Sequence, residues 1–443
     1  MRYFDLVVIG SGIAGGNPAL RCAKAGWKVA VIDHSPFGGT CALRGCSPKK
    51  ALVSVSEARD YPDRMKEMGV VGAVRLNWSH VMKFKDSFTS SVPESTKKLY
   101  RDQGIMNYQG TAQFLSTGSL RVGGEELRSR YFLVASGAMP RPLSLEGSSL
   151  INTSEEFLNL RELPRKIIFV GGGYVSFEFA HMAARAGSQV HILHSGQRVL
   201  KHFDGDLVQQ LVAASREVGI EIITNAEVME IREGFIVRTD DKQEFRAGLV
   251  VHGAGRVPQI QNLDLDKAGV KSGEKGILVN EYLQTSNPRI YAAGDCCAAG
   301  APLSPVARVQ AKAVSENILK GNTIKMDYRI IPSVVFTQPP LARVGLGEWE
   351  LRDEGVKFEK TVGDSSQWAT MRRVGVKHAG YKILVEPATG KILGAHLLGH
   401  HAEEVINIFA LAMKKGATKE ELINIPWTFP TSSSDIPTML EQS

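Results

Sequence analysis

The sequence predicts an α/β fold in which a strand–helix–strand unit with a glycine-rich turn occurs twice. An apolar strand at 4–9 runs into Gly10-Ser11-Gly12-Ile13-Ala14-Gly15, and another at 166–170 runs into Gly171-Gly172-Gly173-Tyr174-Val175-Ser176. A pair of cysteines separated by four residues follows the first unit. Units of this kind are typical of doubly wound sheets whose turns bind dinucleotides, so we expect two Rossmann-like domains.

Each glycine of the first turn has a physical role. Gly10 allows the tight turn, Gly12 lets the backbone approach a pyrophosphate, and Gly15 permits close packing of the helix after the turn. The second strand of the unit ends at Asp33, whose carboxylate can accept hydrogen bonds from ribose hydroxyls. Strand, turn, helix and acid together predict a dinucleotide site.

The second unit differs from the first at the position of the acid. The spacing from Gly171 to His194 equals that from Gly10 to Asp33, so His194 takes the place of the carboxylate. With no carboxylate to repel a 2′-phosphate and with cations nearby, this unit is expected to prefer NADPH over NADH. The expected contacts come from Gly171, Gly173, His194, Ser195 and Arg198, with Lys201 close by.

The two cysteines, Cys41 and Cys46, predict a redox-active disulfide beside a flavin. Gly45 permits the bent backbone that such a ring requires. A thiol at a helix N-terminus loses its proton easily, and the two lysines next along the chain, Lys49 and Lys50, would stabilise the thiolate.

Composition limits the classes of protein that fit. The 443 residues are 43% hydrophobic, enough for substantial cores, yet no apolar run has the length of a membrane helix. The first strand starts too close to Met1 for a signal peptide, so a cytoplasmic location is expected. Five cysteines do not form a secreted disulfide framework, which makes the pair catalytic or metal-binding.

The net charge of +7 has two interpretations. It is either a solvated basic surface or a set of charges that serves a phosphate-bearing cofactor or an acidic substrate. The chain has no long basic run with interleaved aromatic residues, so nucleic acid is not an expected partner.

The ordered motifs resemble the pyridine nucleotide-disulfide oxidoreductase family of glutathione reductase, dihydrolipoamide dehydrogenase and mercuric reductase. The likeness covers essentially the whole chain. Besides the two fingerprints and the cysteine segment, it includes, in family order, Ala135-Ser136-Gly137, Gly255-Arg256-Val257-Pro258, Ala292-Ala293-Gly294-Asp295, Val335-Phe336-Thr337 and the segment 390–396.

The resemblance implies roles for individual residues. Cys46 would lie next to the flavin as the charge-transfer thiol, and Cys41 would meet the substrate as the interchange thiol. A lysine, Lys49 or Lys50, would pair near the flavin with a glutamate matching Glu178. The other implied contacts are the nicotinamide gate Tyr174, the adenosine-ribose ligand Asp33, the flavin ribityl ligand Asp295 and the cofactor-binding residues Thr40, Gly137 and Arg256.

The resemblance also implies the architecture and the partners. An FAD-binding domain is expected at 1–145 and 281–329, an NAD(P)H-binding domain at 146–280, and an α+β dimerisation domain at 330–443. The implied molecule is a homodimer that contains FAD and in which part of each active site comes from the partner chain. Its electron acceptor would be a small-molecule or protein disulfide, with no metal site and no membrane partner.

The chain departs from the family near its C-terminus. The family presents His-Pro-Thr-x-x-Glu, whereas this chain reads Phe429-Pro430-Thr431-Ser432-Ser433-Ser434-Asp435. Phe429 cannot move a proton, Ser434 replaces the glutamate, and Asp435 lies one residue late. General acid–base groups typically contribute about 10²- to 10⁴-fold to rate, so ordinary glutathione-like disulfides should turn over poorly.

This departure has three interpretations. In the favoured one, NADPH reduces FAD, FAD reduces the Cys41–Cys46 disulfide, and the dithiol reduces an acceptor whose leaving thiol is acidic enough to depart unassisted. The second follows the example of a family member that also carries Phe at the histidine position, 2-ketopropyl-coenzyme M oxidoreductase/carboxylase, in which carbon dioxide captures a carbanion. In the third, the protein is a redox-sensing flavoprotein with little turnover.

Overall fold

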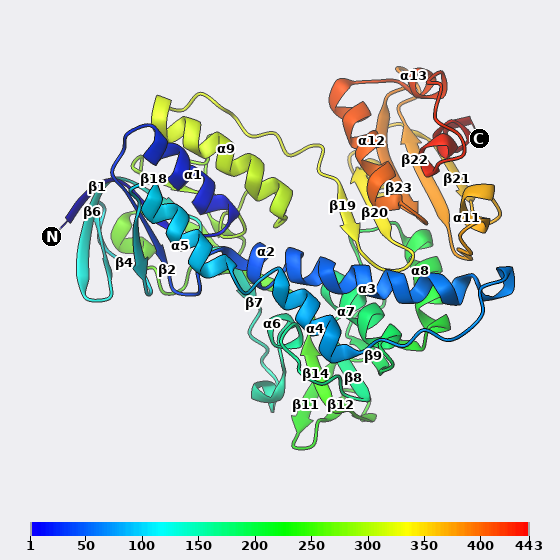
Figure 1. The fold of residues 1–443 in the computed structure, drawn as a ribbon. Helices are drawn as coiled ribbons and strands as arrows, with labels where there is room; N and C mark the ends of the chain where they lie inside the picture. The colour runs from blue at the N-terminus through cyan, green and yellow to red at the C-terminus, as the bar shows by residue number, and fades with distance from the viewer. Residues whose placement is uncertain (1, 442–443) are drawn as a thin grey trace. The chain divides into compact units, whose positions relative to one another are not determined.

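The computed structural model describes residues 2–441, in which the chain forms two compact units (Figure 1). Unit 1 contains the residues up to Ala51 together with Lys83–Pro142 and Gly255–Tyr328. Unit 2 contains Leu52–Met82, Leu143–Ala254 and the residues from Arg329 onward. Two helices, α3 (Cys46–Arg64) and α4 (Trp78–Ser87), each begin in one unit and end in the other.

A sheet of seven strands forms the centre of unit 1, in the order β3-β2-β1-β6-β5-β4 with β18 beside β6. The strands that pair in parallel are β1 (Arg2–Ile9), β2 (Val29–Asp33), β3 (Met106–Gln109), β6 (Glu125–Val134) and β18 (Ile290–Ala292). The antiparallel hairpin of β4 (Gln113–Ser116) and β5 (Ser119–Val122) continues the sheet from β6.

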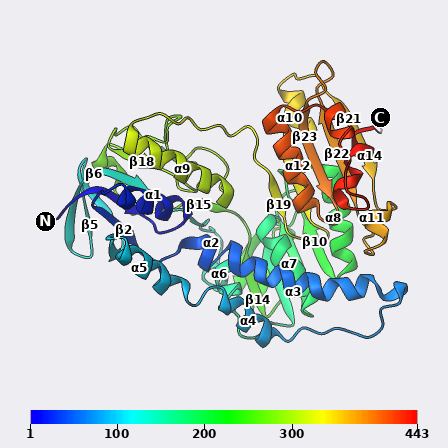
Figure 2. The ribbon, with the colours of Figure 1, turned by 45° about the horizontal axis from the view of Figure 1, so that its top comes forward.

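Alternate residues of the central strands enter two different cores, because successive side chains of a strand point to opposite faces. Leu6 and Val8 pack with α1 (Ile13–Lys24), α5 (Val92–Asp102) and α9 (Ser304–Lys320). Val7 and Ile9 pack on the other face, against the β4–β5 hairpin and the segment that leads to β18. Helices α1 and α9 lie side by side in both ribbon views (Figures 1 and 2).

The remaining elements of unit 1 are short. They are α2 (Gly39–Leu43), the pair β7 (Ala138–Pro140) and β15 (Arg256–Pro258), and the pair β16 (Ser272–Gly273) and β17 (Gly276–Ile277).

Unit 2 contains a parallel sheet of four strands in the order β10-β9-β8-β14. Its strands are β8 (Lys166–Val170), β9 (Gln189–His194), β10 (Ile220–Thr224) and β14 (Leu249–His252), and its crossover helices are α7 (Tyr174–Arg185) and α8 (Gly205–Glu217). A short helix, α6 (Ser154–Phe157), precedes β8, and a three-stranded sheet of β11 (Val228–Arg232), β12 (Ile236–Thr239) and β13 (Glu244–Arg246) follows β10.

The second sheet of unit 2 is antiparallel, in the order β19-β20-β23-β22-β21. Its strands are β19 (Ser333–Val335), β20 (Leu341–Gly345), β21 (Glu359–Asp364), β22 (Gly380–Val385) and β23 (Ile392–Leu398). Phe409 of α12 (Ala402–Lys415) packs on this sheet in a core with Tyr381 and Ile406. The other helices of this region are α10 (Glu348–Asp353), α11 (Ala369–Arg372), α13 (Lys419–Ile423) and α14 (Ile436–Glu441).

This arrangement confirms the predicted fold class. Both predicted strand–helix–strand units are present, as β1-α1-β2 and β8-α7-β9, and they precede a C-terminal region of mixed helix and antiparallel sheet. The expected boundaries of the three domains stay a prediction. Across the described part of the chain, no helix combines the length and the apolar character of a membrane span.

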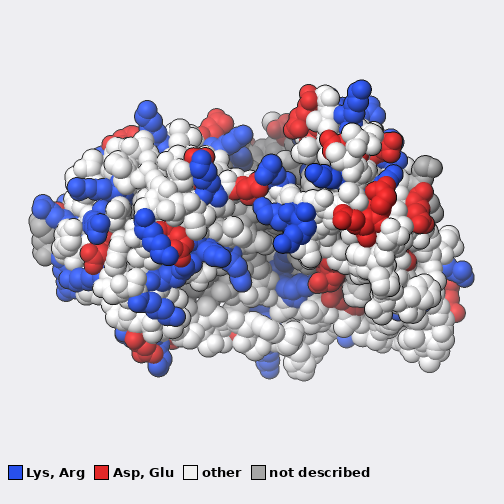
Figure 3. All heavy atoms as spheres, turned by 90° about the horizontal axis from the view of Figure 1, so that it is seen from above, with Lys and Arg blue, Asp and Glu red and all other residues white. Residues whose placement is uncertain are grey.

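Charge is unevenly divided between the two units. Unit 1 carries 25 Lys and Arg against 14 Asp and Glu, whereas unit 2 carries 28 against 32. Figure 3 shows Lys and Arg side chains spread over the surface of unit 1, in the left half of the view. The excess of positive charge is therefore a property of the unit that contains the first glycine-rich turn.

Candidate active site

A cleft in unit 1 opens at the carboxyl ends of its parallel strands. It is lined by the residues that come directly after β1, β6 and β18 and by the last residue of β2. Ligands of doubly wound sheets bind at this edge. Most of the predicted residues of the first cofactor site line the cleft: Gly10, Gly12, Asp33, Thr40, Cys41, Gly137 and Asp295.

Two glycine-rich segments approach each other in this cleft at a distance that excludes side chains. A Cβ on Gly39 would lie 2.3 Å from Gly12 Cα, and a Cβ on Gly10 would lie 2.2 Å from the carbonyl oxygen of Ala135. Gly12 is the N-cap of α1 and supplies no side chain to the helix start. The first N–H groups of α1 are therefore available to a pyrophosphate, and the cradle fits the dinucleotide that the sequence predicts.

Asp33 holds the glycine-rich turn from the end of β2. Its Oδ2 accepts hydrogen bonds from the backbone N–H and the hydroxyl of Ser11, at 2.8 and 2.6 Å, and its Oδ1 accepts one from the N–H of Ser35 at 2.9 Å. The carboxylate thus positions the turn in addition to lining the cleft. Its predicted contact with a ribose stays a prediction.

Asp295 lies at the edge of the cleft directly after Gly294, in the turn beyond β18. Burial raises the pKa of this carboxyl group, and the guanidinium of Arg256 partly offsets the effect. Arg256 in turn donates a hydrogen bond to the carbonyl of Ala138, which fixes the β7–β15 pair beside Gly137. The structure therefore brings Gly137, Arg256 and Asp295 to one edge of the cleft.

The two cysteines are adjacent and carry free thiols in this structure. Cys41 belongs to α2, and Cys46 is the first residue of α3. The hydrogen bond from the Cys41 thiol, helped by Ser304 and by the charge of Lys49, lowers the pKa of Cys46 to about 6, although burial opposes the shift. The same hydrogen bond and burial raise the pKa of Cys41. One thiolate, on Cys46, is thus the stable state of the reduced pair near neutral pH.

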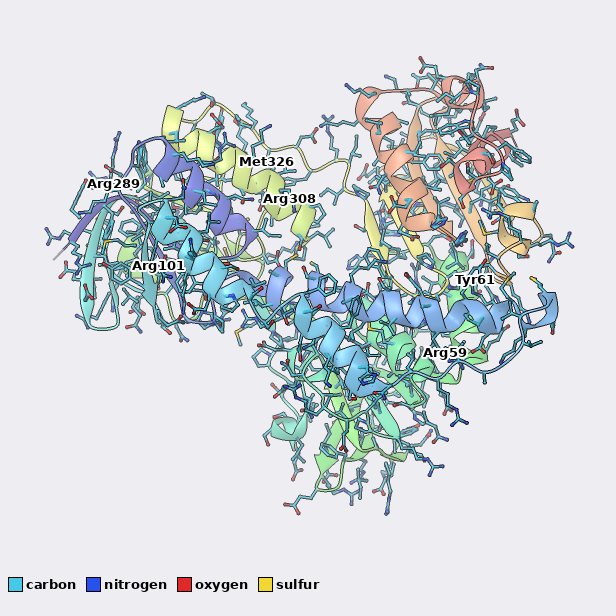
Figure 4. All side chains as sticks on the ribbon, viewed as in Figure 1. Arg59, Tyr61, Arg101, Arg289, Arg308 and Met326 are labelled. Carbon is cyan, nitrogen blue, oxygen red and sulfur yellow. The ribbon has the colours of Figure 1, made fainter. Side chains whose placement is uncertain are left out.

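Ser304 is a site residue that the sequence reasoning missed. Its Oγ lies 3.0 Å from Cys46 Sγ, and it is the first residue of α9. Two helix N-termini, those of α3 and α9, therefore meet at one sulfur, and both dipoles favour its negative charge. Figure 4 shows α9 with Arg308 labelled in its second turn. The Ser-Pro dipeptide at 304–305 indicates a helix start, but no local signal links it to a cysteine 258 residues away.

The second glycine-rich turn lies in unit 2, between β8 and α7. Gly171 has φ +106°, and a Cβ there would lie 2.6 Å from the backbone of Gly253. Gly173 is the N-cap of α7 and provides no side-chain cap, so the helix start has the same open N–H groups as that of α1. Tyr174, the first residue of α7, is exposed beside this turn. The turn fits a second dinucleotide.

His194 lies at the end of β9 against this second turn. Its Nδ1 accepts a hydrogen bond from the N–H of Gly172 at 3.2 Å, so its Nε2 is the nitrogen that donates to the carbonyl of Arg198, at 3.1 Å. Burial and the nearby charge of Lys201 lower the pKa of His194. The imidazole is therefore neutral, and the positive charge near the predicted 2′-phosphate position comes from Arg198 and Lys201, both exposed.

The remaining predicted catalytic residues lie in different surroundings. Glu178 is buried on α7, where its Oε1 accepts a hydrogen bond from the N–H of Phe336 at 2.8 Å. Its pairing with Lys49 or Lys50 stays a prediction. Phe429 is 78% exposed, an unusual state for a large aromatic side chain.

The residues after Phe429 do not restore the missing acid–base pair. Ser434 donates to the carbonyl of Thr431 at 2.6 Å and receives the Thr431 N–H, so it caps the turn that contains it. Asp435 accepts a hydrogen bond from Thr370, and burial raises the pKa of its carboxyl group. Its contact with Thr370 gives Asp435 a structural role.

Comparisons with known proteins match nearly the whole chain. The family model described as pyridine nucleotide-disulphide oxidoreductase matches residues 4–312, and that of the corresponding dimerisation domain matches residues 331–440. A mercuric reductase of Staphylococcus aureus is 32% identical over 95% of this chain and 78% of its own length. A glutathione reductase of a Nostoc species is 30% identical over 98% of this chain and 99% of its own.

A further relative and a solved structure agree with these matches. A dihydrolipoyl dehydrogenase of Staphylococcus aureus is 30% identical over 96% of this chain and 94% of its own. The structure of a Cu(II) complex of RclA, a HOCl-induced flavoprotein disulfide reductase of Escherichia coli, superimposes with a TM-score of 0.89. It is 27% identical, and the match covers 99% of both chains.

The contact between Ser304 and Cys46 gives a direct prediction. In Ser304→Ala, loss of a hydrogen bond to a thiolate should raise the apparent pKa of Cys46 from about 6 to about 7. The pKa is read from the ultraviolet absorbance of the thiolate in the reduced protein as pH is varied. Ser315→Ala is the matched control, because that hydroxyl donates to Lys312 within the same helix. An unchanged midpoint in Ser304→Ala, or a titration that persists in Cys46→Ser, would contradict the assignment.

Proposed function

The chain belongs to the pyridine nucleotide-disulphide oxidoreductase family, and on this premise we propose that it carries electrons from NADPH through bound FAD and the Cys41–Cys46 couple to an acceptor. Members of this family are FAD-dependent and use nicotinamide dinucleotides. The observation that carries the proposal is the hydrogen-bonded cysteine pair, poised as one thiolate and one thiol at the rim of the dinucleotide cleft.

Separate residues of the chain would bind the flavin and accept its electrons. The turn at Gly10–Gly15 and the start of α1 would hold the pyrophosphate of FAD, and Asp295 would hold its ribityl chain. Bound FAD supplies two-electron transfer between the nicotinamide and the cysteine pair. Cys46, with its lowered pKa and its contact to Ser304, would be the thiolate that stays beside the flavin after reduction.

Reduction of a disulfide acceptor by this pair would proceed in two displacements. Cys41 sulfur attacks one acceptor sulfur, forms a mixed disulfide and releases the first acceptor thiolate. That first thiolate takes from Cys46 the proton that Cys46 has received from Cys41, and the Cys46 thiolate then attacks Cys41 sulfur, releases the second acceptor thiolate and restores the Cys41–Cys46 disulfide. Because the pKa of Cys41 is raised, the proton on Cys41 must first leave, and the Cys46 thiolate that accepts its hydrogen bond is the adjacent base.

Because Phe429 replaces the histidine that transfers protons in the family, this residue determines which acceptors the cysteine pair can reduce. The first released thiolate can take the one proton of the cysteine pair, but the second has no donor unless its own pKa is low, because Phe429 offers none. We therefore propose an acceptor whose leaving group departs as a stable anion, or one that has no leaving group. The 78% exposure of Phe429, together with the match to a dimerisation domain, supports a homodimer in which this ring faces the partner chain.

A cupric ion is a second candidate acceptor. It is favoured by the solved Cu(II) complex of the RclA flavoprotein and by the missing proton donor. Oxidation of the reduced pair, one thiolate and one thiol, to a disulfide gives two electrons and one proton, and two Cu(II) ions take up the electrons to become two Cu(I). This reaction breaks no bond in the acceptor, so it needs no general acid. The relevant assay is anaerobic NADPH oxidation with two Cu(I) ions trapped by a chelator per NADPH.

The acid–base departure can be tested by restoring the family residues. The double substitution Phe429→His with Ser434→Glu should raise the turnover of glutathione disulfide by about 10-fold or more, because a positioned acid–base pair contributes about 10²- to 10⁴-fold. The measurement is NADPH oxidation at saturating disulfide. Phe429→Asn with Ser434→Gln is the control of similar polarity that moves no proton. Equal rates in both double variants would contradict the explanation that the missing acid–base pair limits disulfide turnover.

The preference for NADPH can be tested at Lys201, an exposed cation beside the second glycine-rich turn. Lys201→Ala should raise the KM for NADPH about 10-fold through loss of a charge-assisted contact with the 2′-phosphate, and leave that for NADH unchanged. Arg216→Ala, at the far end of α8, is the control for a general change of charge. A wild-type protein that uses both nucleotides equally well would refute the preference.

A further inference from the structure

The loop that joins β9 to α8 carries the cations proposed to bind the 2′-phosphate. Four hydrogen bonds shape this loop. His194 donates to the carbonyl of Arg198, the guanidinium of Arg198 donates to the carbonyls of Lys201 and Phe203, and the N–H of Leu200 donates to the carbonyl of Gly172 at 2.9 Å. Leu200 has a positive φ of 47°, and its side chain is buried. The loop is therefore compact, and its shape depends on a strained residue.

Two cations from the antiparallel sheet hold the same loop from outside. Arg343 of β20 donates to the carbonyl of His202 and pairs with Glu350 at 2.7 Å. Lys382 of β22 donates to Asp204 and to Asp206, at 2.7 Å in each case. Each cation therefore joins one strand of this sheet to the end of the loop that leads into α8.

Asp204 connects the second of these contacts to the helix. Its Oδ1 accepts the N–H of Asp206 at 3.1 Å as the N-cap of α8, while its Oδ2 accepts the ammonium of Lys382. The side chains of Lys382 and Asp204 are 5% and 7% exposed. Burial lowers the pKa of Lys382, but the hydrogen bonds with both aspartates overcome this and raise it, so the ammonium stays charged. A buried pair of this kind is costly to break, because the remaining charge has no compensation.

We propose that Arg343 and Lys382 are positioning residues that set the affinity for the 2′-phosphorylated nucleotide by fixing the loop from residue 198 to residue 206. The inference rests on the NADPH preference proposed above and extends it to residues of a different sheet. Both contact the loop through His202 and Asp204, and the proposed phosphate contacts belong to Arg198 and Lys201. A loop fixed before binding loses less conformational entropy when the ligand arrives, which strengthens binding.

Arg343 and Lys382 both lie in the C-terminal region of the chain. β20 and β22 belong to the segment 331–440 that matches the dimerisation domain. The region that would mediate association of two chains therefore also contributes to nucleotide selection.

The test measures nucleotide binding without turnover. Calorimetry with the FAD-loaded protein compares adenosine 2′,5′-bisphosphate with adenosine 5′-monophosphate, which lacks the 2′-phosphate. Lys382→Met should weaken binding of the bisphosphate about 10-fold and leave the monophosphate unchanged, since coupling between sites is typically about 5- to 150-fold. Lys382→Arg, which keeps the charge and the donors, should restore most of the affinity.

Lys419→Met is the control for loss of a lysine elsewhere in this region, because Lys419 belongs to α13 and pairs with Glu359 at 3.9 Å. It should bind both ligands as the wild type does. Wild-type protein that does not distinguish the two ligands would refute the NADPH preference itself. Wild-type protein that distinguishes them, with Lys382→Met doing so equally well, would overturn the inference alone. If Lys382→Met does not fold, Arg343→Met decides the same question through His202, with the Asp204 pair intact.

Discussion

The proposed chemistry of this protein depends on one hydrogen bond, from the thiol of Cys41 to the sulfur of Cys46. It places the single negative charge of the reduced pair on Cys46, where the N-termini of α3 and α9 meet and where Ser304 and Lys49 stabilise it. The same hydrogen bond raises the pKa of Cys41. The thiolate is thus on the sulfur expected beside the flavin, and the sulfur expected to meet the acceptor keeps its proton. An acceptor that needs both a thiolate nucleophile and a proton donor is poorly served by this arrangement.

Each of the two units contains a similar strand–turn–helix segment. In both, a glycine-rich turn leads into a helix whose first N–H groups are open to a phosphate, because the glycine N-cap provides no side-chain cap. The two units differ at the end of the second strand. Asp33 secures the first turn through Ser11, whereas His194 secures the second through Gly172 as a neutral ring. The carboxylate is replaced by a group of the same structural role and no negative charge, which is consistent with the proposal that Arg198 and Lys201 attract the 2′-phosphate of NADPH.

The sequence predicted the features that depend on local spacing, and it missed those that depend on tertiary contacts. The two fingerprints, the cysteine pair at a helix start and the position of His194 could all be read from short segments of the chain. The hydrogen bond from Ser304 could not, because the fold brings together residues 258 positions apart. The neutral state of His194 depends on burial and on the nearby charge of Lys201, which spacing does not reveal. The contacts of Arg343 and Lys382 with the β9–α8 loop could not be predicted either, since in the sequence each residue is an ordinary cation of a strand.

The proposed function depends most on electrons passing through the cysteine pair, and an anaerobic reductive titration of the FAD-loaded protein tests this directly. We predict that each chain takes up four reducing equivalents, two in the disulfide and two in the flavin, and that two thiols become titratable as the first pair is added, because the flavin passes its electrons on to the disulfide. Uptake of only two equivalents, with no new thiols and no difference between the wild type and Cys41→Ser, would contradict this electron path.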